Sequence, residues 1–384
     1  MERIMRVIVT GGGTSGHVNP AISIADMIKQ KEPDSEFLFV GTDRGIENKL
    51  VPKAGYKLAF VNVRGIRRSL SPSNIKSLYL ALTSPHKAKK LIREFKPDIA
   101  IGTGGYVSWP VMKAAASMGI PTLIHESNSY PGVAVRMLAG CVDRILVNFE
   151  ATKELLPEKY RSKVVRTGNP LREEFLSADK ERSAKALGIF GKYRKFLLAC
   201  GGSMGAEKIN LAVLELMRDY GTKHPEMLIE LSTGSIEYEA TKSRFKEYGL
   251  EKYPNLKLYE YIYDMPARMA AADAVINRAG AMTLSELAAL GKPSILIPSP
   301  NVTDNHQYKN AHELESHSAA ILIEEKALTE KKLEAAVDSV MFKGADKTLS
   351  EAIKAYRTPD TKKLIYDEIC NLIYKYKSGK KSKN

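Results

Sequence analysis

Short apolar segments alternate with amphipathic segments along most of the chain. The N-terminal half holds apolar segments that are each long enough for a buried strand, at 5–10, 36–41, 57–61, 98–102, 121–124 and 143–147. Most of the intervening segments repeat apolar residues with the period of a helix. Strands that alternate with helices pair in parallel, because each helix returns the chain to the same end of the sheet. The pattern therefore predicts an α/β fold built on parallel sheets.

A polar, charged stretch at 173–194 interrupts the pattern, which then starts again. Further strands are predicted at 195–200, 226–232, 256–259, 273–276, 294–297 and 319–322. A strand followed by a glycine turn occurs in both halves, which indicates two Rossmann-like domains, and 384 residues are enough for both. We predict a first domain over 1–174, a second over 175–358, an amphipathic helix over 359–374 and a disordered lysine-rich tail over 375–384.

Composition excludes several classes of protein. No apolar run approaches the roughly 18–20 residues that cross a bilayer, and residues 1–10 resemble a buried strand rather than a signal peptide. Cys141, Cys200 and Cys370 lie far apart without metal-ligand spacing, and an odd number argues against a disulfide scaffold. These features favour a protein that works in the cytosol.

The chain carries a large positive charge. Lysine and arginine number 58 and aspartate and glutamate 44, which leaves a net charge of +14. This favours an anionic partner (nucleic acid, a phosphorylated substrate or an acidic membrane face), but it also fits a basic surface that only aids solubility. A predicted helix carries Ile75, Leu78, Tyr79 and Leu82 on one face, and this face could either pack in a core or contact an anionic bilayer. Arg67 and Arg68 precede the helix, and Trp109, the single tryptophan, follows the turn at 102–106, which lies near it in the predicted topology.

Three glycine turns follow predicted strands. The turn at 11–16 has the spacing G-x-G-x-x-G, which lets the backbone bend tightly and lets an anion approach the N–H groups at a helix start. Nicotinamide enzymes share this spacing but place an acid about 20 residues further on, whereas Asp43 lies 27 residues after the turn. The turn at 201–206, where Ser203 would cap the next helix, and the turn at 102–106 could also hold a diphosphate. Each also fits a tight connection that binds nothing.

Polar side chains follow several strands, at the edge where open α/β sheets bind ligands. His17 could act as a general base, because its ordinary pKa lies near 6.5, or it could hydrogen-bond the backbone at a helix start. Residues 125–128 place four polar side chains after a strand, which is typical of a site, with loop solvation as the alternative. Arg172 could bind a diphosphate or form a salt bridge between domains.

Two further polar groups follow strands of the second half. Glu286 lies in the helix after the turn at 277–283, where its carboxylate could accept hydrogen bonds from two ribose hydroxyls or complement the helix dipole. Residues 304–307 offer amide and acid groups for sugar hydroxyls. No Asp-x-Asp pair sits at a strand end, so the signature of a metal-dependent sugar transferase is absent from the sequence.

Seven motifs together resemble the MurG family of bacterial glycosyltransferases over nearly the whole chain. Each motif alone is modest evidence, whereas their joint order and spacing are highly specific. They are GGGTSGHVNPA (11–21), GTGGYVSWP (102–110), HESNSYPG (125–132), GNPLR (168–172), GGSMGAEKIN (201–210), NRAGAMTLSEL (277–287) and DNHQYKNA (304–311).

The resemblance implies a GT-B fold, in which two Rossmann-like domains face each other across a cleft and the C-terminal helix packs back towards the first domain. It implies an inverting transfer of N-acetylglucosamine (GlcNAc) from UDP-GlcNAc to the C4 hydroxyl of lipid I, which is undecaprenyl-pyrophosphoryl-N-acetylmuramyl pentapeptide, to give lipid II. The expected partners are UDP-GlcNAc, lipid I, an anionic membrane surface and other cell-wall synthesis proteins, without nucleic acid, cofactor or bound metal. The expected location is the cytoplasmic face of the cell membrane, as a peripheral protein.

The resemblance also implies roles for single residues. His17 matches the family's candidate base, and the acceptor diphosphate would lie against Gly13, Gly104, Gly105 and Tyr106. His306 and Met204 stand where some members carry glutamine, and the second change removes a polar side chain from the turn at 201–206. The donor contacts would be Thr14, Ser15, Gly16, Asn128, Arg172, Ser203, Ile262, Ala281, Met282, Thr283, Glu286 and Gln307.

Other functions share parts of this pattern. A UDP-GlcNAc 2-epimerase or a glycolipid glycosyltransferase would use the same kind of donor loops without a lipid-diphosphate acceptor. A Rossmann oxidoreductase would hold a nicotinamide or flavin that absorbs light. A non-catalytic nucleotide-binding membrane adaptor would transfer no sugar to any acceptor.

Overall fold

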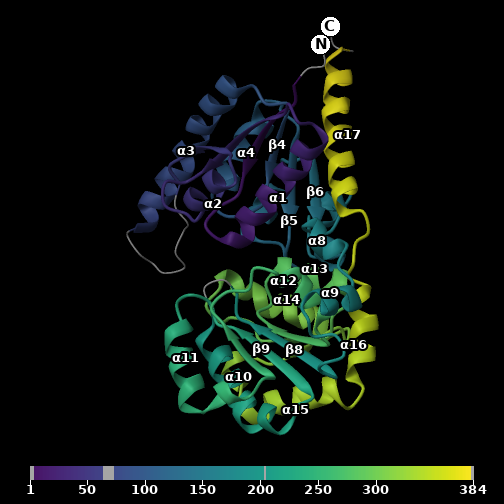
Figure 1. Ribbon diagram of the computed structural model, residues 1–384. Helices are drawn as coiled ribbons and strands as arrows, with labels where there is room; N and C mark the ends of the chain where they lie inside the picture. Colours follow the sequence, from purple (N-terminus) through teal and green to yellow (C-terminus); the bar gives the residue numbers. More distant parts are fainter. Residues whose placement is uncertain (1–3, 64–72, 203–204, 382–384) are drawn as a thin grey trace. The chain divides into compact units, whose positions relative to one another are not determined.

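The computed structural model describes residues 4–63, 73–202 and 205–381 and divides the chain into two compact domains (Figure 1). The first domain comprises Met1–Pro170 with Thr358–Asn384, and the second comprises Leu171–Arg357. The chain therefore leaves the first domain after Pro170 and returns to it at Thr358. The sequence pattern places these two divisions slightly later, after residues 174 and 358.

A parallel sheet of seven strands forms the centre of the first domain, in the order β3-β2-β1-β4-β5-β6-β7. Strand β1 lies inside the sheet and pairs with β2 and β4, so that Val7 lies opposite Phe37 and Ile99. The predicted strands are all present, whereas β7 was not predicted, because it is a three-residue edge strand that is only half-buried. The strands are β1 Arg6–Thr10, β2 Glu36–Gly41, β3 Lys57–Phe60, β4 Ile99–Gly102, β5 Thr122–Glu126, β6 Arg144–Val147 and β7 Val164–Arg166.

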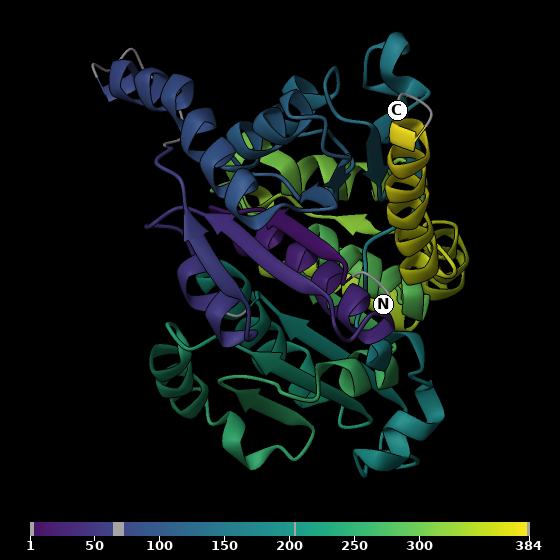
Figure 2. The ribbon, with the colours of Figure 1, turned by 90° about the horizontal axis from the view of Figure 1, so that it is seen from above.

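Helices cover both faces of this sheet. Alternate residues of a strand point to opposite faces, so Val7 and Val9 pack in a core with α1 and α17, whereas Ile8 packs in a second core with α3, α4 and α5. In both views of the ribbon, α17 (yellow) lies along one side of this domain (Figure 1, Figure 2). The helices are α1 Ser15–Lys31, α2 Glu47–Lys53, α3 Ser73–Phe95, α4 Ser108–Ser117, α5 Val133–Leu138, α6 Ala151–Glu154, α7 Glu158–Arg161 and α17 Thr361–Lys381.

The last helix is longer than the sequence predicts. α17 buries an apolar stripe that includes Ile365 and Ile369, and it continues through Lys381, so the prediction of a disordered tail from residue 375 is wrong over 375–381. Polar contacts hold this end: the Tyr376 hydroxyl donates to Asp143 Oδ1 at 2.8 Å, and Lys377 Nζ lies 3.6 Å from Asp98 Oδ1. Residues 382–384 of the predicted tail lie outside the described residues.

The second domain repeats this design with six parallel strands in the order β10-β9-β8-β11-β12-β13. A large apolar core joins one face of its sheet to α10 (Glu207–Asp219), α15 (Glu330–Met341) and α16 (Ala345–Lys354). The strands are β8 Lys195–Cys200, β9 Met227–Ser232, β10 Leu256–Tyr259, β11 Ala274–Asn277, β12 Ser294–Leu296 and β13 Ile321–Leu322. They agree closely with the predicted positions, because parallel strands buried on both faces are continuous apolar runs.

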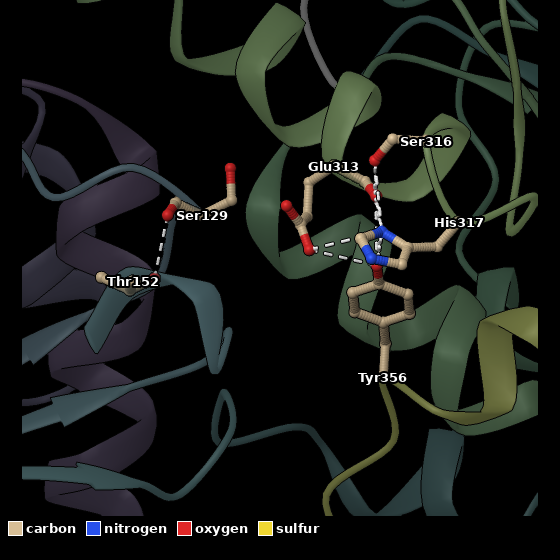
Figure 3. A network of polar contacts seen from close by, with 6 residues as sticks. All are labelled: Ser129, Thr152, Glu313, Ser316, His317 and Tyr356. Carbon is tan, nitrogen blue, oxygen red and sulfur yellow. Dashed lines mark hydrogen bonds and ion pairs between the residues drawn. The ribbon is translucent and has the colours of Figure 1, made fainter. Parts of the chain in front are cut away.

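The polar stretch at 173–194 is structured and contains α8 and α9, which pack against α12. The far end of α14 is tied to the segment after α16, where the Tyr356 hydroxyl donates to Glu313 O at 3.1 Å beside His317 (Figure 3). The helices are α8 Glu173–Leu176, α9 Lys180–Ala186, α10 Glu207–Asp219, α11 Tyr238–Glu247, α12 Met265–Ala271, α13 Ala281–Leu290, α14 His306–Glu315, α15 Glu330–Met341 and α16 Ala345–Lys354, with 3-10 turns η1 Gly221–Lys223, η2 Leu250–Lys252, η3 Thr303–Asn305 and η4 Glu325–Ala327. Among the described residues, no helix combines the length and apolar character that crossing a bilayer requires.

Candidate active site

Two glycine turns meet at the carboxyl edge of the first sheet. A Cβ atom on Gly105 would lie 2.2 Å from Gly12 O, so only glycine permits this approach, and Gly104 and Gly105 both have positive φ. Tyr106 lies over Gly13, because a Cβ atom there would be 3.2 Å from the Tyr106 ring. The structure thus brings together the four residues predicted to contact the acceptor diphosphate.

The first turn leads into the uncapped start of α1. The N-cap residue Thr14 makes no side-chain capping bond, and the first turn of the helix contains no acidic residue. Residues 13–16 are exposed. A helix start of this kind favours an anion, because its N–H groups and the helix dipole present partial positive charge.

His17 is held between the two turns. Its Nδ1 lies 3.1 Å from Thr103 O, and because a carbonyl can only accept a hydrogen bond, Nδ1 carries the hydrogen. The lone pair of the neutral ring is therefore on Nε2. The Thr103 hydroxyl donates back to His17 O at 2.7 Å, and Gly104 leaves room for the ring. The hydrogen bond to the backbone that the sequence allowed is present, and the role of His17 as a general base stays a prediction.

The polar residues 125–128 begin within the fifth strand, and three of the four are buried rather than in a solvated loop. His125 and Glu126 are the last residues of β5, with exposed fractions of 0% and 4%. His125 Nε2 donates to Gly168 O at 2.9 Å, and burial lowers the pKa of His125 to about 4, so this ring is neutral near pH 7. His125 therefore ties β5 to the segment that leads out of the domain.

Glu126 orients Asn128, the predicted contact of the donor sugar. The Glu126 carboxylate accepts hydrogen bonds from Asn128 N at 2.9 Å, Asn128 Nδ2 at 3.0 Å and Gly132 N at 2.7 Å. Burial raises the pKa of the Glu126 carboxyl, and these bonds partly offset that rise. The Thr152 hydroxyl holds the next residue, since it donates to Ser129 O at 3.0 Å (Figure 3). Glu126 and Asn128 are only two residues apart, and this short spacing is the signal by which the sequence could have indicated the role of Glu126.

In the second domain, the turn before α13 is shaped by amide side chains. Asn277 Nδ2 donates to Cys200 Sγ at 3.0 Å, and Asn310 Nδ2 donates to Ala279 O at 3.2 Å. The helix then starts at Ala281 after Gly280, without a side-chain cap and without an acidic residue in its first turn. Ala281, Met282 and Thr283 therefore form the first turn of a ten-residue helix whose start favours an anion.

Glu286 and Arg172 interact electrostatically in the same domain. Burial raises the pKa of the Glu286 carboxyl to about 7, and the positive charge of Arg172 partly opposes that rise. Arg172 is exposed, with its guanidinium 5.2 Å from the centre of the Phe175 ring. The positive charge of Arg172 therefore acts on the Glu286 carboxyl, and the predicted contacts of these two residues with a diphosphate and a ribose stay predictions.

The segment before α14 is strained. Asp304 and Asn305 have φ values of 59° and 52°, which lie in the left-handed region that residues with side chains rarely adopt. Backbone strain of this kind gathers at functional sites. Gln307 Oε1 accepts a hydrogen bond from Ser299 N at 2.9 Å, so its NH₂ group is the part that can donate to a ligand. Burial lowers the pKa of the neighbouring His306.

A buried charge network supports the loop that contains Ile262. Ile262 is 4% exposed. Arg268 on α12 donates to Asp264 Oδ1 at 2.8 Å and forms a short ion pair with the buried Glu230 on β9. This network has no signature in the sequence, because its members belong to separate elements and have no common spacing.

Some of the predicted site residues are not described by the structure or do not lie where they were predicted. Ser203, Arg67 and Arg68 lie outside the described residues, as do the side chains of Ile75, Leu78, Tyr79 and Leu82 on α3. The prediction that Ser203 caps the next helix is wrong, because α10 begins at Glu207 and its N-cap residue is Ala206. Trp109 is half-buried against the core that contains α3, α4 and α5. No cluster of three or more His, Cys, Asp or Glu suited to a metal occurs within the described ranges.

Comparison with known proteins assigns the chain to a family. Residues 7–147 match the N-terminal domain of glycosyltransferase family 28, and residues 196–365 match its C-terminal domain. A relative from Acetivibrio thermocellus, a UDP-GlcNAc–N-acetylmuramyl-(pentapeptide) pyrophosphoryl-undecaprenol GlcNAc transferase, is 46% identical over 84% of this chain and 86% of its own length. The chain belongs to the MurG family. A Bacillus cereus protein of the same description is 40% identical over 97% of this chain and all of its own.

Solved structures agree with this assignment. The crystal structure of Acinetobacter baumannii MurG superposes with a TM-score of 0.76 at 25% identity, covering 96% of this chain and 99% of that one. A UDP-GlcNAc 2-epimerase from Neisseria meningitidis reaches a TM-score of 0.64 at 15% identity over 96% of this chain and all of its own, a likeness that concerns the fold alone. The predicted α/β class with two Rossmann-like GT-B domains is therefore confirmed, and membership of the MurG family argues against an oxidoreductase.

Proposed function

We propose that this protein transfers GlcNAc from UDP-GlcNAc to the C4 hydroxyl of lipid I with inversion at the sugar, which gives lipid II. The observation that carries this proposal is the 46% identity, across both domains, to a relative described as a transferase of that acceptor and sugar. The uncapped helix starts and the His17 ring add physical support, because they suit a reaction that moves a proton and releases a diphosphate.

The donor belongs to the second domain in this proposal. The Glu286 carboxylate accepts hydrogen bonds from the ribose hydroxyls, the backbone of Ile262 reads the uracil, and the Gln307 NH₂ group donates to a sugar hydroxyl. The diphosphate lies at the start of α13 near Arg172. When the bond between the sugar and UDP breaks, its electron pair leaves with UDP, and the helix start and Arg172 stabilise the added negative charge.

The first domain supplies the base and holds the acceptor. Nε2 of His17 takes the proton of the C4 hydroxyl as that oxygen attacks the anomeric carbon of GlcNAc from the face opposite UDP. Attack from that face inverts the anomeric centre. General base catalysis of this kind contributes roughly 10²–10⁴ in rate. The turns at 12–13 and 104–106 cradle the acceptor diphosphate, and Asn128, oriented by Glu126, contacts the donor sugar.

The proposal includes a peripheral site of action at the cytoplasmic face of the membrane, without a bound metal or other cofactor. Lipid I is an anionic lipid, and a protein with a net charge of +14 is attracted to anionic surfaces. The face formed by α3 and the neighbouring Trp109 would make the contact. Other cell-wall synthesis proteins are expected at the same surface, and nucleic acid is not.

The test is a transfer assay with labelled UDP-GlcNAc and a short-chain lipid-linked muramyl pentapeptide. The expected product carries one GlcNAc linked β-1,4 to the muramyl sugar. A parallel reaction without acceptor separates the alternatives, because a 2-epimerase would convert UDP-GlcNAc to its C2 epimer. Epimer formation, or no transfer to the acceptor, would refute the proposal.

A further inference from the structure

A buried carboxylate lies directly beneath the first glycine turn, and the proposed reaction does not use it. Glu47, the first residue of α2, is 0% exposed. Its Oε1 accepts hydrogen bonds from Thr42 N at 3.0 Å and Thr42 Oγ1 at 2.8 Å, and its Oε2 accepts one from Gly13 N at 3.0 Å. Among the described residues, no basic side chain forms a salt bridge with it. A buried carboxylate bound only by neutral donors is costly to desolvate, so its position needs a reason.

Three glycines make room for this side chain. A Cβ atom on Gly12 would lie 2.7 Å from Glu47 Oε1, one on Gly41 would lie 2.7 Å from its Cγ, and one on Gly45 would lie 1.9 Å from its Oε2. None of the three has a positive φ, so the backbone conformation alone does not require glycine there. Glycine is required at these positions because the Glu47 side chain fills the space that another side chain would need. The ends of two neighbouring strands and the loop before α2 are thus built around one carboxylate.

The contacts of Glu47 and Thr103 hold the turn at both ends. Glu47 holds Gly13 N, and Thr103 holds His17 through its ring and its carbonyl. Between them lie residues 14–16, the start of α1. We infer that Glu47 is a positioning residue: its bond to Gly13 N sets the path of residues 13–16 and, through them, the place of His17. This inference rests on the proposed function. It also means that the backbone of Gly13 helps to shape the anion site, whereas its N–H group donates to Glu47.

The charge of Glu47 and its hydrogen bonds have opposite effects on an anion at this turn. The negative charge repels the anion, so if charge alone mattered, Glu47→Gln would improve binding and turnover. If positioning dominates, Glu47→Gln is harmful, because glutamine has one acceptor oxygen and its NH₂ group must face either Gly13 N–H or the Thr42 donors. The net effect of the neutral substitution therefore separates the two roles.

The experiment compares full-length Glu47→Gln with Asp143→Asn. Asp143 is the matched control, because it also accepts the N–H and hydroxyl of one threonine, Thr122, and a third donor, Tyr376, but it lies at the amino edge of the sheet. Steady-state assays give kcat and KM, calorimetry gives the affinity for UDP, and hydrogen exchange reports on the peptide containing residues 11–17. We expect Glu47→Gln to lower kcat roughly tenfold or more, from the loss of one charge-assisted hydrogen bond. UDP affinity should stay within twofold, because the proposed contacts of the uracil, the ribose and the diphosphate all belong to the second domain. Exchange at 11–17 should rise.

Each other outcome overturns the inference. Unchanged or higher turnover in Glu47→Gln would show that the charge of Glu47 is the dominant effect. An equal loss of kcat in Asp143→Asn, or a loss of UDP affinity that parallels the loss of kcat, would indicate general damage to the fold. If Glu47→Gln does not fold, Thr42→Val removes one of the three bonds, and we expect roughly threefold lower kcat and faster exchange at 11–17; no change in either would refute the role. The exchange measurement needs no substrate. It therefore tests Glu47 even if the wild-type protein transferred no sugar, a result that would refute the proposed function separately.

Discussion

Lowering the pH from 8 to 6 is expected to weaken the binding of UDP-GlcNAc, because in the proposed function the ionised Glu286 carboxylate accepts hydrogen bonds from both ribose hydroxyls. Burial raises the pKa of this carboxyl to about 7. An acid with that pKa is about nine-tenths ionised at pH 8 and about one-tenth at pH 6. If only the ionised form binds, the dissociation constant rises roughly tenfold over this range, since apparent affinity scales with the population of the competent form.

Binding of UDP-GlcNAc should also release a proton from Glu286. At pH 6 the bound state would be ionised and the unbound state mostly protonated, so binding should release close to one proton, and at pH 8 almost none. Calorimetry in two buffers with different ionisation enthalpies measures this number. UDP-GlcNAc is the appropriate ligand, because its diphosphate diester does not titrate between pH 6 and 8, whereas UDP itself has a terminal phosphate that does.

Two variants make the test specific. Glu286→Gln should bind UDP-GlcNAc more weakly at pH 8, with no pH dependence and no proton release, and Glu286→Ala should behave in the same way. His306→Gln serves as the control, because His306 also titrates in this domain and the pKa of its ring is lowered by burial. The reasoning is refuted if wild-type affinity does not change with pH, if Glu286→Gln keeps the wild-type slope, or if Glu286→Ala binds the donor normally.

Three further predictions concern the base, the last helix and the metal requirement. His17→Ala should lower turnover by at least ~10² while donor affinity by calorimetry changes little; normal turnover would remove His17 as the base. Ile369→Ala, at a fully buried position of α17, should lower the free energy of unfolding by about 2–5 kcal/mol in urea titrations, whereas Tyr374→Ala, at a position that is 75% exposed, should change it by about 0.5 kcal/mol or less. Treatment with EDTA followed by desalting should leave transfer unchanged; permanent loss that only magnesium or manganese restores would contradict a metal-free mechanism.

The strands and the turns could be predicted from the sequence because their signals are local. A strand buried on both faces is a continuous apolar run, as in 195–200, and a turn that needs positive φ or close packing carries glycine, as at Gly104 and Gly105. The strand β7 could not be found in this way, because its three residues are only half-buried. Motif resemblance supplied the residues that local signals could not single out, such as Ile262.

Contacts between distant parts of the chain could not be predicted from the sequence. Lysines near the C-terminus suggested disorder, yet α17 continues through them, because Tyr376 and Lys377 meet Asp143 and Asp98 from segments more than 230 residues earlier. Glu47 gave no signal either. A carboxylate in a charged stretch suggests a solvated surface, and only its contacts with Gly13 and Thr42 show that the side chain is buried.

The two domains handle negative charge differently, although both present a glycine turn before a helix. In the second domain the start of α13 has no side-chain cap, and the positive charge of Arg172 acts on the Glu286 carboxyl. In the first domain the Gly13 N–H is occupied by the Glu47 carboxylate, and the His17 ring is tied to Thr103. This difference agrees with the proposed roles, in which the second domain holds the charge of the donor and the first positions the base. It follows that substitutions at Glu286 should change donor affinity, whereas those at His17 and Glu47 should change turnover and leave UDP binding intact.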